Sequence, residues 1–369
     1  MKVSIVLPTY NQADMLPKAV QSIMAQTYGN WELIIVNDGS TDDTVQYLET
    51  LPKSSQFKIV HHDANQKLPS ALNTGFEFAM GDYYTWISSD SVCAPYMIQG
   101  LVRALNQYPD EAGLAYADFF IIDENDHILS RVSNPDYGFR SMVIRNDGNA
   151  AFMYPAKVAK EIGTYDTDLN GAEDWDYWLR IAEKYPFVYV PEALYYYRVH
   201  TKSMQQTIQK EVNESITKMY DKLFERHHKQ FQFTQLFPYL DMESDLVYYA
   251  LANFGSDMLT ARIQQPMNAT VFLKAAIEKD ASGLVPWLNL SIAYAYLKQW
   301  DNALICIREL KNRGAGNPIM QYVKQAEQAY LEKSIEKTLE IPIIGFHNEQ
   351  QQIVIKELKH KRHVAFTMD

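Results

Sequence analysis

The chain has 369 residues, 47% of them hydrophobic and 13% aromatic, which is enough apolar material for two folded domains and argues against a disordered chain. Its formal net charge of −11 argues against a nucleic-acid-binding protein, because binding phosphates requires basic surface. The two cysteines, Cys93 and Cys306, fit neither a disulfide framework nor a metal-binding motif, which favours a reducing, cytoplasmic compartment.

The N-terminal stretch MKVSIVLPTYNQ is apolar over too few residues for a signal peptide and instead predicts a first strand. No apolar run approaches the roughly 20 residues that a membrane helix needs. We therefore expect a protein that does not span a membrane.

Strand and helix patterns alternate over residues 1 to about 130. The expected strands are the apolar runs VSIVL, WELIIVN, FKIVHH and YYTWI, and helical spacing follows each of them. Such alternation predicts a mostly parallel sheet with helices on both faces, in which ligands bind beyond the carboxyl ends of the strands. Polar residues recur at three of those ends, in the stretches PTYN (8–11), NDG (37–39) and SSD (88–90).

Residues from about 114 to 200 show a mixed pattern. LAYADFFIID and HILSRV predict an antiparallel pair of strands around residues 124–126, and NAAFMY predicts another short strand. The stretch GAEDWDYWLRIAEKY opens with acids and continues as an amphipathic helix, while FVYVPEALYYYRVH predicts a strand that ends near His200.

The chain becomes helical after about residue 204. A tetratricopeptide-like helical hairpin is matched by the spacing of Trp287, Leu290, Tyr294, Ala303 and Ile307. The second helix of a preceding unit, one period of 34 residues earlier, is matched by Ala269, Leu273 and Ala276. A generic antiparallel helix pair explains the same pattern equally well.

We expect residues 204–334 to form this helical region and residues 335–369 to form a tail. The tail contains IPIIGF and the basic run KELKHKRH. A charged run near a terminus is usually solvated, and contact with a membrane or an acidic partner is the alternative.

Six sequence elements, in order, resemble those of glycosyltransferase family 2. They are IVLPTYNQ, IIVNDGSTDDT, LPSALNTGF, WISSDS, GAEDWDYWLR and YYYRVH, and each lies where the pattern predicts a strand end or a helix start. The resemblance covers residues 1–203 and implies a GT-A fold, which is a Rossmann-like, mostly parallel α/β sheet flanked by helices. It also implies an enzyme that transfers a sugar from a nucleoside diphosphate, usually UDP, to an acceptor hydroxyl with inversion.

By this resemblance the nucleotide lies against the first two strand ends. Thr9, Tyr10 and Asn11 are implied to hold the base, with Tyr10 offering an aromatic face. Asp38 is implied to accept a hydrogen bond from the base or the ribose. Lys67 lies where many relatives carry a basic residue near the nucleotide, although a solvated lysine fits equally well. A strand-end turn and a helix cap are the structural alternatives for the others.

Ser88, Ser89 and Asp90 align with the Asp-x-Asp motif of the family. The last acid of that motif is the usual metal ligand, so Asp90 is implied to bind a divalent cation, manganese or magnesium, that neutralises the departing diphosphate. Serine replaces the acid that meets the ribose, a contact that the Ser88 hydroxyl can also make. His200 matches a histidine that serves some relatives as a further metal ligand, and a structural histidine is an equal alternative.

Glu173 and Asp174 match the acidic pair of the family. An inverting transfer needs a base that takes the proton of the acceptor hydroxyl, and the resemblance assigns this role to Asp174. Glu173 or Trp175 is implied to contact the acceptor, and Trp175 fits equally well inside the domain. The structural alternative for both acids is stabilisation by the dipole at the first turn of a helix.

No Gln-x-x-Arg-Trp motif occurs, which favours single-sugar transfer over processive synthesis. The expected partners are a nucleotide-sugar donor and a glycan, lipid-linked or protein acceptor, without nucleic acid. Beside a lipid-linked acceptor the enzyme would work at the inner face of the membrane by peripheral association, and the helical region could hold a protein partner.

Two other functions fit the sequence less well. A weakened nucleotide-sugar-binding scaffold would explain the serines at acidic motif positions, but the chain keeps Asp38, Asp90, Asp174 and His200 together. A sugar nucleotidyltransferase would need a Gly-rich basic loop after the first strand, where this chain has LPTYNQADM.

Overall fold

The computed structural model describes residues 1–135, 150–201, 208–227, 266–313 and 319–343, together with residues 248, 251–252, 255–256 and 258–259. Contacts divide the chain into two compact units, Met1–Lys229 and Gln230–Asp369. Helix α9 (Gln209–His227) therefore belongs to the first unit. The boundaries at 203/204 and 334/335 stay predictions, and the basic run of the tail lies outside the described residues.

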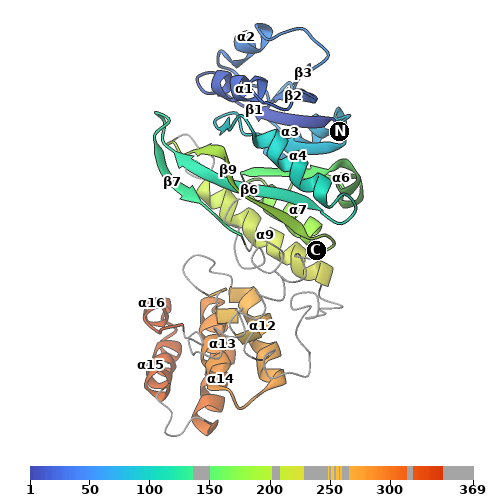
Figure 1. The fold of residues 1–369 in the computed structure, drawn as a ribbon. Helices are drawn as coiled ribbons and strands as arrows, with labels where there is room; N and C mark the ends of the chain where they lie inside the picture. Colours follow the sequence, from blue (N-terminus) through green and yellow to red (C-terminus); the bar gives the residue numbers. More distant parts are fainter. Residues whose placement is uncertain are drawn as a thin grey trace. The chain divides into compact units, whose positions relative to one another are not determined.

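The first unit is built on a nine-stranded sheet with the order β3-β2-β1-β4-β8-β6-β9-β5, in which β7 pairs with β6 (Figure 1). Its parallel part consists of β1 (Val3–Thr9), β2 (Trp31–Asn37), β3 (Phe57–His61) and β4 (Tyr83–Trp86). Every residue of β1 and β2 is buried, as continuous apolar runs predict. The predicted parallel α/β architecture is thus confirmed.

Three helices connect these strands: α1 (Leu16–Met24), α2 (Thr44–Glu49) and α3 (Leu68–Glu77). A Cβ on Gly75 of α3 would lie 2.4 Å from Cγ1 of Val6, so glycine lets α3 pack directly on β1. The turn after β2 also requires glycine, because Gly39 has a φ of 73° and a Cβ there would lie 2.6 Å from the carbonyl carbon of Ala64.

The second half of the sheet is mixed. It contains β5 (Val92–Cys93), α4 (Met97–Gln107), β6 (Leu114–Ile122), β7 (Ile128–Val132), β8 (Ala151–Pro155), α6 (Ala156–Ile162), α7 (Glu173–Ala182) and β9 (Phe187–Arg198). β6 and β7 form the predicted antiparallel pair, β8 runs antiparallel to β4 and β6, and β9 runs parallel to β6. Pro191 lies in β9 where the pairing with β6 shifts register, which is where a strand tolerates proline.

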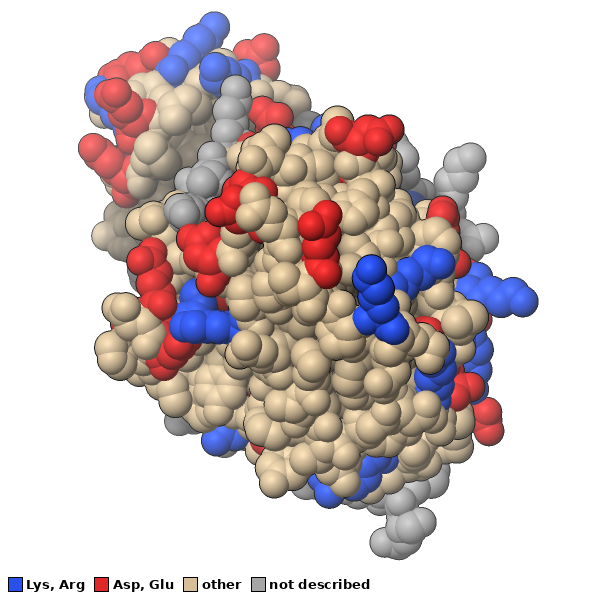
Figure 2. All heavy atoms as spheres, turned by 90° about the horizontal axis from the view of Figure 1, so that it is seen from above, with Lys and Arg blue, Asp and Glu red and all other residues tan. Residues whose placement is uncertain are grey.

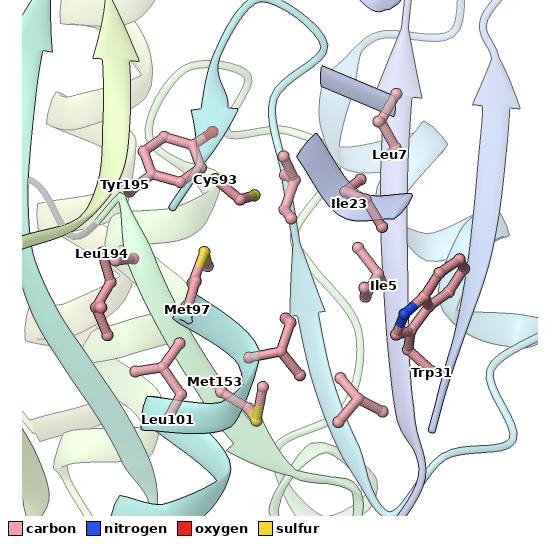
Figure 3. Close-up of a cluster of buried hydrophobic side chains, with 14 of the residues drawn as sticks. Ile5, Leu7, Ile23, Trp31, Cys93, Met97, Leu101, Met153, Leu194 and Tyr195 are labelled. Atoms are coloured by element: carbon pink, nitrogen blue, oxygen red, sulfur yellow. The ribbon is translucent and has the colours of Figure 1, made fainter. Parts of the chain in front are cut away.

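The core of the first unit lies between the sheet and helices α1 and α4 (Figure 3). On one side Met97 and Leu101 of α4 face Leu194 of β9 and Met153 of β8. In another part of the same core, Ile23 of α1 lies beside β1. This continuous apolar packing joins the parallel and the mixed halves of the sheet into one rigid support for the loops at its edge.

Helix α9 is docked onto the first unit by polar contacts. Lys222 Nζ lies 2.5 Å from Asp166 Oδ2, and Arg226 Nη1 lies 3.2 Å from the buried carboxylate of Asp176 in α7. Arg180 pairs with the same carboxylate at 2.8 Å, so the buried charge of Asp176 is compensated twice.

The second unit is helical, as predicted. Its described helices are α12 (Pro266–Lys279), α13 (Leu284–Tyr296), α14 (Trp300–Arg313), α15 (Met320–Leu331) and α16 (Ile335–Leu339). Helix α13 contacts the other four helices. This explains why α13 itself carries apolar residues on nearly every side. No helix in the described part of the chain is long and apolar enough to cross a membrane.

Figure 2 shows charged side chains of both signs spread over one face, with uncharged surface between them.

Candidate active site

The carboxyl ends of β1, β2 and β4 meet at one edge of the sheet. Thr9 and Asn37 are paired at the last position of β1 and β2, and the N–H of Asp38 donates to the Thr9 carbonyl at 2.9 Å. On the other side of β1, the N–H of Ile87 donates to the Val6 carbonyl at 2.9 Å. The residues predicted to hold the nucleotide and the metal therefore follow three adjacent strands.

The loops after β1 and β2 are fastened to each other. The N–H of Asn11 donates to Ser40 Oγ at 3.0 Å, and Asn11 Oδ1 accepts from the N–H of Thr41 at 2.7 Å. The N–H of Ala13 donates to Asp42 Oδ2 at 3.1 Å. These reciprocal hydrogen bonds hold both loops in one arrangement.

The last residue of β1 and the residue after it differ in exposure. Tyr10 is 44% exposed, so its ring is accessible at the edge of the sheet. Thr9 is 3% exposed, and its buried Oγ1 has no hydrogen-bond partner among the described residues. A buried hydroxyl without a partner is uncommon and is often found where a ligand binds.

Asp38 is buried and organises the loop after β3. Its Oδ1 accepts from His62 Nδ1 at 2.7 Å and from the N–H of Gln66 at 2.8 Å, and its Oδ2 accepts from the N–H of Lys67 at 2.9 Å. His62 Nε2 lies 3.0 Å from Thr74 Oγ1 of α3. Sequence analysis missed His62, although a polar histidine at the end of a strand was a visible signal.

Lys67 adopts an unusual backbone conformation, with a φ of 76° and a ψ of 162°. Residues other than glycine rarely adopt these backbone angles. The hydrogen bond from the Lys67 N–H to Asp38 helps to hold the backbone in this conformation. Lys67 thus stands at the start of α3, at the same edge of the sheet as Asp38.

Asp90 is surrounded by hydrogen-bond donors. Its Oδ1 accepts from Ser88 Oγ at 2.7 Å and from Ser91 Oγ at 2.8 Å, and its Oδ2 lies 3.1 Å from His200 Nε2. Burial alone would raise the pKa of this carboxyl, but the hydrogen bonds from His200, Ser88 and Ser91 outweigh burial and lower it. Asp90 is therefore held as a carboxylate.

Arg198 fixes the backbone around Asp90. Its Nε donates to the Asp90 carbonyl at 2.8 Å and its Nη1 to the Asp123 carbonyl at 2.8 Å, while Nη2 lies 2.5 Å from Asp126 Oδ1. Asp126 also pairs with Lys18 of α1 at 2.6 Å. The YYYRVH element thus ends in Arg198, which is buried and positions the Asp90 loop, and in His200, which faces the carboxylate of Asp90.

Glu173 and Asp174 form the first turn of α7. Glu173 is 2% exposed and its Oε2 accepts from the N–H of Gly171 at 2.6 Å, whereas Asp174 is half-buried and its Oδ1 accepts from the N–H of Trp175 at 2.6 Å. Burial and repulsion from Asp174 raise the pKa of Glu173, and burial raises the pKa of Asp174. Trp175 is 8% exposed, which favours packing inside the domain over stacking on a sugar.

Tyr197 lies near both acidic groups. Burial raises its pKa to about 12, and the negative charges of Asp90 and Asp174 add to the rise, so this tyrosine lies in the field of both carboxylates. Its ring packs edge-on against Phe119, with centroids 6.2 Å apart. Asp90, which faces His200, and Asp174, which follows Glu173, thus both lie near Tyr197. Sequence analysis missed Tyr197, because three consecutive tyrosines in a strand also fit ordinary packing.

Asp90 and His200 offer a carboxylate and an imidazole, which are both ligand types that manganese accepts. The side chain of Asp90 is 17% exposed and that of His200 is 1% exposed. The buried Nδ1 of His200 has no partner among the described residues. No group of three or more His, Cys, Asp or Glu side chains in the described part of the chain could hold a metal by itself.

Comparison with solved structures agrees with this fold. The crystal structure of S. aureus TarS 1–349 in complex with UDP-GlcNAc matches with a TM-score of 0.58, and another crystal structure of TarS 1–349 matches with a TM-score of 0.53. Sequence identity is 14% and 15%, and each match covers 90% of this chain and 93% or 92% of the TarS chain. At such identity the likeness establishes the architecture alone.

Sequence relatives identify the class of protein. An uncharacterized glycosyltransferase of Rickettsia typhi is 30% identical over 222 residues, which cover 58% of this chain and 68% of the relative. An uncharacterized glycosyltransferase of Haemophilus influenzae is 27% identical over 231 residues, which cover 59% and 71%. Together with the fold and the acidic edge of the sheet, these matches define a glycosyltransferase.

The family follows from a second comparison. The family model described as glycosyl transferase family 2 matches residues 4–158. The chain belongs to this family.

Proposed function

We propose that this glycosyltransferase moves a hexose from a UDP-sugar to an acceptor hydroxyl with inversion, and that residues 1–203 form the domain that does so. The observation that carries the proposal is the placement of two acidic groups. Asp90 follows β4 and is contacted by Ser88, Ser91 and His200, and Glu173 and Asp174 begin α7. One of the groups, Asp90, has a lowered pKa, and the other, the Glu173–Asp174 pair, has raised pKa values. Environments that push carboxyl pKa values apart are typical of sites in which one acid stays charged and another exchanges a proton.

The donor is proposed to lie along the ends of β1, β2 and β4. The exposed ring of Tyr10 and the unpaired Thr9 hydroxyl would face the base, together with Asn11. Asp38 and Lys67 would contact the base, ribose or phosphates from the next strand end, with Ser88 and Ser89 near the ribose. UDP-GlcNAc is the first donor to test, because the TarS structure of the same architecture contains it.

The proposed step is a single in-line displacement. The acceptor oxygen forms a bond to the anomeric carbon of the sugar while the bond from that carbon to the β-phosphate oxygen breaks. The acceptor proton passes to the carboxylate of Asp174, and UDP leaves with the bonding electrons. Glu173, which is buried, would keep the pair at one net negative charge.

A divalent cation, manganese or magnesium, is part of the proposal. Asp90 and His200 would hold it, and when bound it would neutralise the growing charge of the diphosphate. The donor set fits this group, since the carboxylate is ionised and the buried imidazole stands beside it. Because the described residues supply two ligands, the phosphates of the donor would complete the coordination.

The acceptor is proposed to be a glycan or a lipid-linked precursor in surface glycan or polysaccharide synthesis. The enzyme would then act at the inner face of the membrane without spanning it. Flotation with anionic liposomes tests this association, and protein that stays entirely out of the lipid fraction in the presence of acceptor would contradict it.

The decisive experiment is a screen of UDP-sugars for hydrolysis and for transfer, run with the full chain and with Asp174→Asn. We expect UDP release from at least one donor by the wild type and a loss of that release in the variant. Binding of UDP-sugars by calorimetry without any turnover would contradict the enzyme and favour a nucleotide-sugar-binding scaffold.

We also propose that the second unit consists of tetratricopeptide-like hairpins that hold an acceptor or a protein partner. α12 and α14 begin 34 residues apart, at Pro266 and Trp300. Equivalent positions in the two helices are buried, namely Ala269 and Ala303, Leu273 and Ile307, and Ala276 and Leu310. An experimental structure in which α13 and α14 fail to superpose on a tetratricopeptide hairpin would contradict this assignment.

A further inference from the structure

The LPSALNTGF element contains an asparagine that the proposed nucleotide and acceptor contacts leave unexplained. Asn73 lies in α3 and forms two hydrogen bonds with one residue far along the chain. Its Nδ2 donates to the Tyr165 carbonyl at 2.8 Å, and its Oδ1 accepts from the N–H of Tyr165 at 2.8 Å. A side-chain amide offers a donor and an acceptor side by side, and this pairing uses both.

The ring of Tyr165 strengthens the same link. It stacks on Phe76 of α3 with centroids 5.9 Å apart and on Tyr177 of α7 with centroids 4.1 Å apart. The interplanar angles are 16° and 13°, so the tyrosine lies between two nearly parallel rings. Tyr165 therefore joins α3 to the helix that begins with Glu173 and Asp174.

The segment beside Tyr165 is fastened to α7 as well. Tyr177 Oη donates to the Gly163 carbonyl at 3.1 Å, and Arg180 donates to the carbonyls of Ile162 at 2.9 Å and Thr164 at 3.0 Å. These contacts hold residues 162–165 against α7. Asn73 then supplies two hydrogen bonds that link this segment to α3.

The next residue of α3 serves the opposite side. Thr74 Oγ1 lies 3.0 Å from His62 Nε2, and His62 pairs with Asp38. Asp38 also accepts from the N–H of Lys67 at the start of α3. Helix α3 therefore contacts His62 in the loop after β3 through Thr74, and it contacts Tyr165, which packs on α7, through Asn73.

We propose that Asn73 is a positioning residue that sets the Glu173–Asp174 turn relative to the donor-binding strand ends through Tyr165. The inference deepens the proposed function, because the catalytic role of the turn rests on it. The link itself rests on the hydrogen bonds and ring contacts alone.

The test uses the full chain, two variants and one control. Asn73→Ala removes both hydrogen bonds, and Asn73→Asp keeps the acceptor for the Tyr165 N–H but places a carboxylate against the Tyr165 carbonyl. Asn106→Ala is the matched control, since Asn106 of α4 accepts from Tyr83 Oη at 2.7 Å and makes no hydrogen bond to α7 among the described residues. Should Asn73→Ala fail to fold, Asn73→Asp carries the test.

We expect hydrogen exchange of residues 164–174 to accelerate at least about tenfold in both Asn73 variants, with residues 62–67 unchanged. The kcat for sugar transfer should fall about 10- to 100-fold, because a displaced base loses its alignment, while the Kd for UDP stays within about threefold of wild type. Asn106→Ala should change neither the exchange of 164–174 nor kcat.

Unchanged exchange of residues 164–174 in Asn73→Ala or Asn73→Asp overturns the proposal, as does a loss of UDP affinity as large as the loss of kcat. Failure of the proposed function shows differently. If Asp174→Asn keeps its activity while the Asn73 variants still accelerate exchange, the base assignment is wrong and the positioning of the turn stands.

Discussion

Two groups of acids lie near Tyr197, and their surroundings shift their pKa values in opposite directions. Asp90 follows β4 and accepts hydrogen bonds from two serine hydroxyls and faces a histidine, and these contacts lower its pKa. Glu173 and Asp174 begin α7 and accept from main-chain N–H groups, and burial raises both pKa values. Burial favours the neutral form in both groups. Three side-chain donors outweigh it at Asp90, whereas Glu173 has main-chain donors only and is also repelled by Asp174.

The contrast teaches which chemistry each group suits. A carboxylate that stays ionised suits the neutralisation of positive charge, and in a nucleotide-sugar enzyme this points to a cation beside a diphosphate. A carboxylate whose pKa lies above its ordinary range can both take and release a proton near neutral pH.

Asp174→Asn should have the largest effect. The amide cannot take the proton of the acceptor hydroxyl, so kcat should fall about a thousandfold, within the usual range for general-base removal. The Kd for UDP, measured by calorimetry, should not change. Asp168→Asn, which changes an exposed acid in the loop before α7, serves as the control. Near-normal transfer by a folded Asp174→Asn protein would remove Asp174 from the mechanism.

Asp90→Ala should abolish the effect of metal on nucleotide binding. In the wild type we expect manganese to tighten UDP binding, and in the variant the gain should shrink by at least about tenfold, because a ligand and its charge are lost. Calorimetry of UDP binding with and without manganese measures the gain. An equal gain in both proteins would show that Asp90 is not the ligand.

The comparison also shows how far sequence alone could lead. The four parallel strands were predictable because each is a short apolar run that ends in polar residues, and strand ends of a parallel sheet share one edge. The acids Asp90 and Asp174 were predictable as candidates, because their motifs lie at a strand end and at a helix start.

The long-range contacts that position these acids were not predictable from periodicity. Arg198 holds Asp90 from 108 positions away, and Asn73 holds Tyr165 from 92 positions away. Such pairs depend on how strands and helices are placed in space, and a hydrogen-bonding side chain carries no sequence signal for its partner. Helix α9 is a second example. Its Lys222 and Arg226, which pair with Asp166 and Asp176, lie beyond the residues that the family motifs cover.

Glu173→Gln should stabilise the protein in a pH-dependent manner. The folded-state pKa of Glu173 is raised above its unfolded value, so the contribution of its protonated form is present at acidic pH and is lost as pH rises through the raised pKa. Glutamine mimics the protonated form and can still accept from Gly171.

The two proteins should therefore unfold alike below about pH 4, where unfolded glutamate is also protonated. Above neutral pH the variant should gain a few degrees in Tm, at about 2 to 4 °C for each kcal/mol. Thermal unfolding from pH 4 to 9 measures this difference. A gain that is equal at all pH values would show that Glu173 is not a buried, charge-sensitive acid.

Ser88→Ala should have the smallest effect, and it tests what orients the carboxylate of Asp90, which stays charged at neutral pH in the variant. The variant loses one of the donors to Asp90 Oδ1, so the pKa of Asp90 should rise toward its ordinary value. One such hydrogen bond contributes about 1 kcal/mol, which corresponds to about a fivefold weaker affinity for UDP in the presence of manganese.

The same substitution in an Asp90→Ala background provides the control, because a hydroxyl that acts through Asp90 has nothing to act on there. A fivefold loss that persists without Asp90 would mean that Ser88 contacts the nucleotide directly, as the replaced acid of the family motif does. A loss confined to the protein with Asp90 would assign the hydroxyl to the carboxylate. The serine would then act by holding the carboxylate of Asp90 in the orientation that binds the cation.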